Sequence, residues 1–109
     1  MNLKLYPVVL ELLAAVSPRL PAMRARSYAL ADQLERALIS IPLNVAEGAY
    51  SRGRNRQARY QTAAASAREA MACFEAAHAL GWSAPLPPDI TALFNRVIGT
   101  LVRLVQPKC

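Results

Sequence analysis

Residues 40–48 of the chain read SIPLNVAEG, a run that mixes aliphatic residues with a proline, an asparagine, a glutamate and a glycine. The run lies within a longer pattern of apolar residues at intervals of three and four: Leu30, Leu34, Ala37, Ile41 and Val45. That spacing places the apolar side chains on one face of a helix. The sequence therefore predicts a helix from Ser27, a suitable N-cap residue, to about Tyr50.

Pro42 stands inside this predicted helix. It lacks the N–H group that would bond to the carbonyl of Leu38, and its ring crowds the preceding turn, so a kink is expected there. The alternative is that the proline divides residues 27–50 into two shorter helices. The apolar spacing continues on both sides of Pro42, which favours a single kinked helix.

Three further helical patterns flank this segment. In residues 5–16 the apolar positions are Val9, Leu10, Leu13 and Val16, and two prolines then predict a connection over residues 17–26. In residues 55–80 the predicted seam is Tyr60, Ala64, Ala67, Met71, Phe74 and His78. In residues 89–105 the apolar face is Ile90, Leu93, Phe94, Val97, Leu101 and Leu104, and Pro107 is expected to close the helix.

Four amphipathic helices with short connections predict an all-α, up-down-up-down four-helix bundle whose second helix is kinked by proline. Hydrophobic residues make up 54% of the chain and aromatic residues only 6%, as expected for aliphatic helix packing. The 109 residues are enough for one domain, residues 1–109, with a single core. Alternating strand patterns are missing.

The sequence offers little catalytic chemistry. His78 is the single histidine and falls on the predicted apolar seam, where a packed or interface residue is expected. Cys73 is expected to be a small buried thiol, and Cys109 is the last residue; their spacing matches no metal site. We therefore expect no enzyme, no cofactor and no metal. Without a signal peptide or an apolar stretch that spans a bilayer, a cytoplasmic protein is expected.

Positive charge is concentrated after residue 48. The net charge is +6, and the segment between Gly48 and Glu69 has no acidic residue but contains Arg52, Arg54, Arg56, Arg59 and Arg68. Guanidinium groups donate in a fixed fork that suits phosphate, and the flanking Tyr50 and Tyr60 could stack on bases. Arg52, Arg54, Arg56 and Arg59 are thus predicted to bind nucleic acid. The alternative is a solvated, arginine-rich loop.

Residues 34–37 together with residues 40–48 resemble the signature of a small four-helix bundle family encoded in intervening sequences of bacterial 23S ribosomal RNA genes. The same segments are similar to the accessory variability determinant proteins of diversity-generating retroelements. Residues 66–69 and 80–82 look like a serine–glutamate pair and a helix-ending leucine–glycine–aromatic in these families. Met71 departs from the pattern, since relatives often carry a second glutamate there.

The resemblance implies a four-helix bundle that in some members assembles as a homopentamer. It also implies that the retroelement members bind nucleic acid and a reverse transcriptase through a basic surface, and it brings no catalytic residues. Leu12, Leu43, Ile98 and Val102 flank the predicted seams and could widen an interface between copies. The main alternative function is a protein-interaction scaffold that docks an acidic or polymerase partner.

Six residues of the signature are interpreted as a structural motif: Arg36, Ser40, Pro42, Asn44, Glu47 and Gly48. Asn44 and Glu47 lie three residues apart on one helix face, and Asn44 or Ser40 could satisfy polar groups freed by the kink. Gly48 would permit either a close approach between helices or a change of chain direction. One version pairs Arg36 with Glu47. The alternative is direct ligand binding by Asn44 and Glu47.

Overall fold

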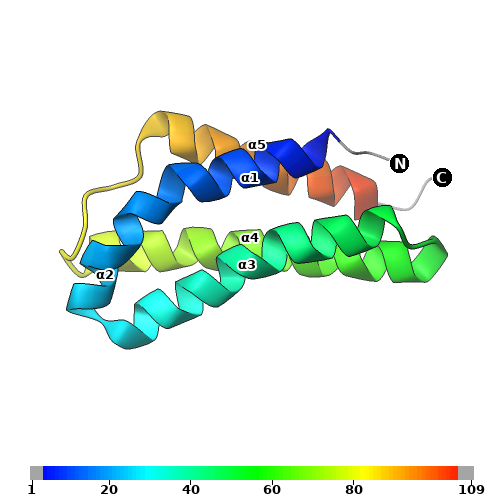
Figure 1. The fold of residues 1–109 in the computed structure, drawn as a ribbon. Helices are drawn as coiled ribbons and strands as arrows, with labels where there is room; N and C mark the ends of the chain where they lie inside the picture. The colour runs from blue at the N-terminus through cyan, green and yellow to red at the C-terminus, as the bar shows by residue number, and fades with distance from the viewer. Residues whose placement is uncertain (1–3, 106–109) are drawn as a thin grey trace.

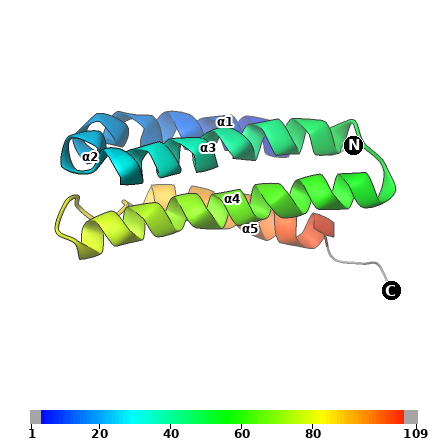
Figure 2. The ribbon, with the colours of Figure 1, turned by 90° about the horizontal axis from the view of Figure 1, so that it is seen from below.

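A computed structural model describes residues 4–105 of the chain. These residues form α1 (Leu5–Val16), the 3-10 turn η1 (Ser17–Arg19), α2 (Leu20–Arg26), α3 (Tyr28–Ala49), α4 (Gly53–Ala79) and α5 (Pro88–Val105), with no strand among them. The four long helices run antiparallel to their chain neighbours in two layers, α1 with α3 and α4 with α5 (Figures 1 and 2). This arrangement confirms the predicted all-α, up-down-up-down bundle.

The core is aliphatic on three of the long helices and built from small residues on α4. Phe94, Leu12 and Met23 are among its largest fully buried side chains. The buried face of α4 consists mostly of alanines, so α3 can pack closely against it. One aromatic pair, Phe74 and Phe94, joins α4 to α5 with ring centroids 6.2 Å apart.

α3 is one continuous helix that contains Pro42, so the single-helix prediction is confirmed and the division into two helices is wrong. Ser27 is its N-cap, as expected, and its hydroxyl accepts a hydrogen bond from the N–H of Leu30 at 3.2 Å. The five predicted apolar positions all face the core. Pro42 itself is buried, which places the missing N–H on the packed side of the helix.

The predicted connection over residues 17–26 is wrong, because this segment is helical. Pro18 and Pro21 lie in the first turns of η1 and α2, where no N–H is needed for a helical hydrogen bond. The prolines thus begin new helical segments instead of ending helical structure. Met23 of α2 is buried in the core, and this contact fixes α2 against the bundle.

One predicted seam is shifted, and another holds except at its last residue. On α1, Leu10 is exposed, whereas Leu12, expected to flank the seam, is fully buried with Leu5, Val8, Val9 and Val16. On α4 the predicted seam is confirmed from Tyr60 to Phe74, whose members are buried or packed against the core. His78 alone is exposed, so it is not packed in the core, and its Nδ1 lies 3.1 Å from the carbonyl oxygen of Ser83. The error on α1 comes from starting the three-and-four alternation in the wrong phase, which the sequence pattern alone does not fix.

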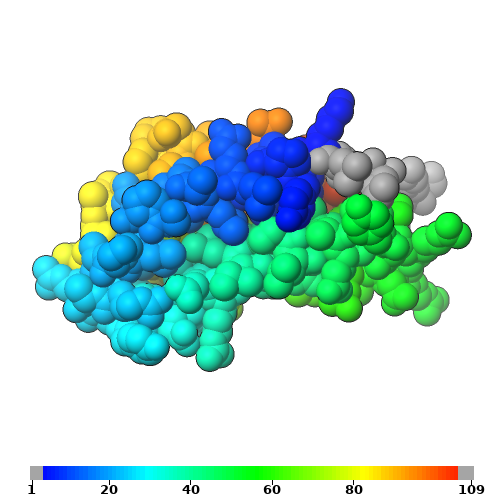
Figure 3. Space-filling model, viewed as in Figure 1, coloured from blue at the N-terminus to red at the C-terminus, as the bar shows by residue number. Residues whose placement is uncertain are grey.

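The segment Leu5–Arg26 is long and apolar enough to cross a membrane by length and composition, contrary to the expectation that no such segment exists. In the bundle, however, the apolar face of its α1 part packs into the core. The mostly buried core helix of a soluble protein and an N-terminal signal sequence meet the same criterion, and 28% of the apolar window is buried here. Figure 3 shows this segment lying over one side of the bundle, next to α3.

α4 ends as the sequence predicts. Gly81 has φ +76°, and the N–H groups of Gly81 and Trp82 donate to the carbonyls of His78 and Ala77, a Schellman cap. Cys73 is a buried free thiol, as expected. The remaining two expectations, for Pro107 and Cys109, fall outside the described residues.

Candidate functional site

The predicted functional residues gather where α3 turns into α4, at one end of the bundle (Figure 1). The N–H groups of Tyr50 and Ser51 donate to the carbonyls of Glu47 and Gly48, and the Ser51 hydroxyl donates to the Glu47 carbonyl at 2.7 Å. Gly53 has φ +56°, a conformation that favours glycine. These bonds define the backbone of a short corner and hold the Ser51 side chain against it.

Gly48 lets α4 approach α3 at this corner. A Cβ atom added to Gly48 would lie 2.5 Å from Cε1 of Tyr60, a ring that is only 3% exposed. The close helix approach predicted for Gly48 is therefore observed. The stacking role predicted for Tyr60 is wrong, because its ring is part of the core.

Arg56 has a structural role at the corner. Its Nε donates to the carbonyls of Ser51 at 2.9 Å and Gly48 at 3.2 Å. These carbonyls lie at the C-terminal end of α3, where a cation is favoured by the helix dipole. The side chain of Arg56 is half-buried, so it is less available for an external phosphate than the sequence suggests.

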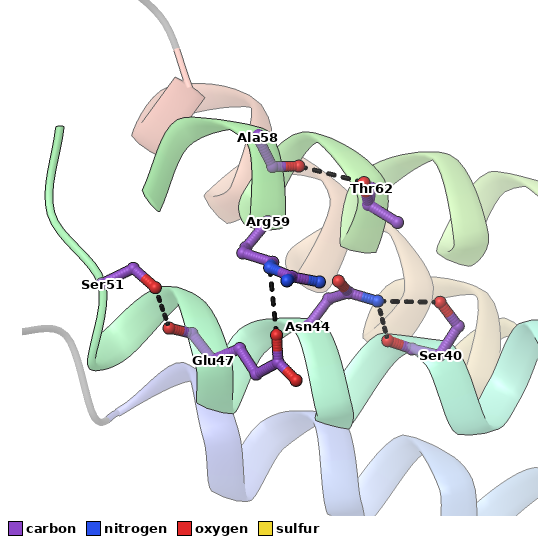
Figure 4. Close-up of polar contacts among 7 residues, drawn as sticks. All are labelled: Ser40, Asn44, Glu47, Ser51, Ala58, Arg59 and Thr62. Atoms are coloured by element: carbon purple, nitrogen blue, oxygen red, sulfur yellow. Dashed lines mark hydrogen bonds and ion pairs between the residues drawn. The ribbon is translucent and has the colours of Figure 1, made fainter. Parts of the chain in front are cut away.

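Arg59 crosses from α4 to α3 and forms an ion pair with Glu47. Nε of Arg59 lies 3.0 Å from Oε2 of Glu47, and both side chains are about half exposed. Figure 4 shows the two side chains meeting between the helices. A pair with this exposure contributes only about 0–1 kcal/mol to stability. The carboxylate nevertheless offsets the charge of Arg59.

Arg52 and Arg54 are exposed and differ from the other two candidates. Within residues 4–105, neither forms a salt bridge or a side-chain hydrogen bond. Arg52 is the N-cap residue of α4, and the first turn of this helix has no acidic residue. Cations at this end oppose the helix dipole, so the two guanidinium groups gain nothing from the fold.

A polar cluster joins the two helices one to two turns before the corner. Nδ2 of Asn44 donates to the carbonyl of Ser40 at 2.9 Å and to its hydroxyl at 3.0 Å. The hydroxyl of Ser66 on α4 donates to the Ser40 hydroxyl at 2.8 Å. Asn44 thus binds Ser40 and not the Leu38 carbonyl that Pro42 leaves without its usual partner. The structural interpretation allows a polar contact either within the bundle or between subunits, and this cluster is a contact within the bundle.

The version that pairs Arg36 with Glu47 is wrong. Arg36 lies 3.3 Å from Asp32, one turn earlier, while Glu47 pairs with Arg59. Residues 36 and 47 share a face of α3, but three helical turns, or roughly 16 Å, separate them. An ion pair along that face is therefore out of reach.

Two open pockets lie side by side between α3 and α4 and share Glu47 and Arg59. The larger has a volume of about 650 Å³ and is lined by Ala46, Glu47, Tyr50, Ser51, Asn55, Ala58, Arg59 and Thr62. The smaller has a volume of about 410 Å³ and is lined by Arg36, Ile39, Ser40, Leu43, Asn44, Glu47 and Arg59. Together they make a groove along this face, which the Glu47–Arg59 pair divides.

The sequence missed Asn55, Thr62 and Ile39 as groove residues. Asn55 and Thr62 are seven residues apart with Arg59 between them, so helical spacing could have placed all three on one face of α4. Among residues 4–105, no group of three or more His, Cys, Asp or Glu side chains could hold a metal ion.

The family comparison bears on these same helices. A family model described as 23S rRNA-intervening sequence protein matches residues 5–87, which is more than half of the chain and includes α1 to α4. No curated protein and no solved structure was found to match the chain. The chain therefore belongs to the 23S rRNA-intervening sequence protein family.

Proposed function

We propose that the protein is a non-enzymatic, oligomeric four-helix bundle that binds nucleic-acid phosphates at the α3–α4 corner. The observation that carries the proposal is the state of Arg52 and Arg54. Both are exposed at one end of the molecule, and within the described residues no carboxylate pairs with them. Unpaired guanidinium groups at a projecting corner suit phosphate oxygens.

The four candidate arginines divide into different roles under this proposal. Arg52 and Arg54 contact phosphates, Arg56 holds the corner through backbone carbonyls, and Arg59 stays close to Glu47. The resemblance to the accessory variability determinant proteins supports a nucleic-acid ligand. The family's name refers to ribosomal RNA genes and identifies no ligand, so RNA and DNA both belong in the test.

The test is the salt dependence of binding to labelled RNA and DNA oligonucleotides. Removing one arginine that neutralises a phosphate should reduce the slope of log K against log salt by about 0.7 for single strands and about 0.9 for duplex DNA. The Arg52→Ala/Arg54→Ala variant should therefore bind more weakly and with a shallower slope. Arg26→Ala/Arg96→Ala is the matched control, since it removes two exposed arginines elsewhere and leaves the same net charge.

Absent binding, or equal slopes for the two double variants, would refute phosphate recognition at the corner. The oligomeric part is tested separately by measuring the mass in solution at micromolar concentration. A mass near 11.9 kDa would show a monomer and refute it.

A protein-interaction scaffold is the second candidate, favoured by one observation. Ile39 and Leu43, one turn apart on α3, are 50% and 59% exposed beside the smaller pocket. Exposed neighbouring apolar side chains are typical of protein contacts. An acidic or polymerase partner docked on this face should stay bound after nuclease treatment and be released by Leu43→Asp; dissociation on nuclease treatment would exclude it.

A further inference from the structure

The larger pocket presents an aromatic ring beside hydrogen-bonding groups. Tyr50 lines it and is 80% exposed, more than any other large apolar side chain of the described residues. An exposed ring of this kind gains little from folding. It offers a flat surface on which a nucleobase can stack.

The polar groups of the pocket complement the edge of a base. The hydroxyls of Ser51 and Thr62 donate to backbone carbonyls, which leaves their lone pairs free to accept (Figure 4). Asn55 supplies both a donor and an acceptor. The volume of about 650 Å³ falls within the roughly 300–1,000 Å³ usual for small-ligand pockets.

The charged residues in and beside the pocket favour different parts of a nucleotide. Glu47 and Arg59 both line the pocket, and their ion pair leaves it without a net charge to attract a phosphate. The carboxylate of Glu47 can still accept from the exocyclic amino group of a base. Arg52 and Arg54 are exposed and are the chain neighbours of the pocket residues Ser51 and Asn55. The pocket thus suits a neutral base and the neighbouring arginines suit the anionic backbone.

We infer that the protein binds single-stranded nucleic acid, with one base stacked on Tyr50 and the adjoining phosphates on Arg52 and Arg54. This inference rests on the proposed function and specifies its ligand. A duplex keeps its bases paired and stacked on one another, so it has no free base face for Tyr50. Single strands expose such faces, and the contact tolerates any sequence because every base has one.

The experiment compares a fluorescein-labelled single-stranded RNA with the same strand annealed to its complement, by anisotropy at low salt. The native protein should bind the single strand more tightly. Tyr50→Ala should weaken single-strand binding roughly tenfold and leave duplex binding almost unchanged. Tyr50→Phe should bind as the native protein does, since the ring remains.

Tyr28→Ala is the matched control. Tyr28 begins α3 at the opposite end of the bundle, is 69% exposed, and lies under the guanidinium of Arg24 at 5.0 Å. Its removal should not change binding. Equal losses of affinity for Tyr28→Ala and Tyr50→Ala would overturn the inference.

The outcomes separate this inference from the proposed function. If both RNAs bind equally and Tyr50→Ala changes neither, while Arg52→Ala/Arg54→Ala weakens both, the inference is wrong and phosphate binding stands. If neither RNA nor DNA binds, both are wrong. If Tyr50→Ala alters only the mass in solution, the ring belongs to a contact between copies, and the inference is overturned.

Discussion

Gly48→Ala tests how closely α3 and α4 approach at the α3–α4 corner. The new Cβ would lie 2.5 Å from Cε1 and 2.7 Å from Cδ1 of Tyr60, well inside van der Waals contact. Tyr60 is buried, so its ring cannot swing out to relieve the contact. Either the ring or the helix axis must shift.

The magnitude follows from two opposing terms. Overpacking of a buried site costs about 1–3 kcal/mol. Alanine is favoured over glycine within a helix by about 1 kcal/mol, and less at position 48, close to the end of α3. The net loss should be about 1–2 kcal/mol in the free energy of unfolding, or roughly 4–16 °C in Tm.

The assay is urea unfolding followed by far-UV circular dichroism at one fixed protein concentration, which matters if the protein self-associates. Gly99→Ala is the matched control: its Cβ would meet only Nη1 of Arg103 at 3.5 Å, so it should stabilise by up to about 1 kcal/mol.

The decisive variant combines Gly48→Ala with Tyr60→Val, since valine has no atom equivalent to Cδ1 or Cε1. Gly48→Ala should cost less in that background than in the native protein. A stabilising effect of Gly48→Ala alone, or no coupling between the two sites, would refute the close approach.

Two further predictions concern the polar and thiol groups of α4. Ser66→Ala removes the hydrogen bond to Ser40 and should lower the free energy of unfolding by about 1 kcal/mol, measured by urea unfolding; an unchanged value would show that water replaces the bond. Burial, and secondarily the charge of Glu69, raise the pKa of Cys73. The folded state therefore keeps this proton to higher pH than the unfolded state, so stability should fall as pH rises through the alkaline range between the two pKa values. The assay is alkylation of Cys73 in the folded protein, with the other cysteine replaced, and the reaction should be slow at neutral pH. In Glu69→Gln the curve of alkylation rate against pH should move to lower pH. An unshifted curve would contradict the contribution assigned to the charge of Glu69.

Much of the fold could be predicted from apolar spacing, because each long helix buries one stripe. Spacing does not fix the phase of a stripe where apolar residues are dense. On α1 nearly every position is apolar, so Leu10 and Leu12 were exchanged between surface and core. On α4 the predicted seam is buried or packed against the core from Tyr60 to Phe74 and fails only at His78, in the last turn of the helix.

The density of arginines at the α3–α4 corner could be read from the sequence, because charge is read directly from it. The partners of Arg56 and Arg59 could not, because the Gly48 carbonyl and the Glu47 carboxylate belong to the preceding helix. Which of several adjacent guanidinium groups is left without a partner depends on tertiary geometry, and spacing alone carries no such information.

The signature at residues 40–48 and the arginine corner are physically coupled. Gly48 sets the distance between α3 and α4 and its carbonyl binds Arg56, while Glu47 binds Arg59. Substitutions in the signature should therefore disturb both stability and the groove, and weaker binding in Gly48→Ala would not identify a contact with ligand. Tyr50, Arg52 and Arg54 are exposed and carry none of the corner's side-chain hydrogen bonds or ion pairs described above. They are the positions at which a binding defect without a stability defect distinguishes recognition from architecture.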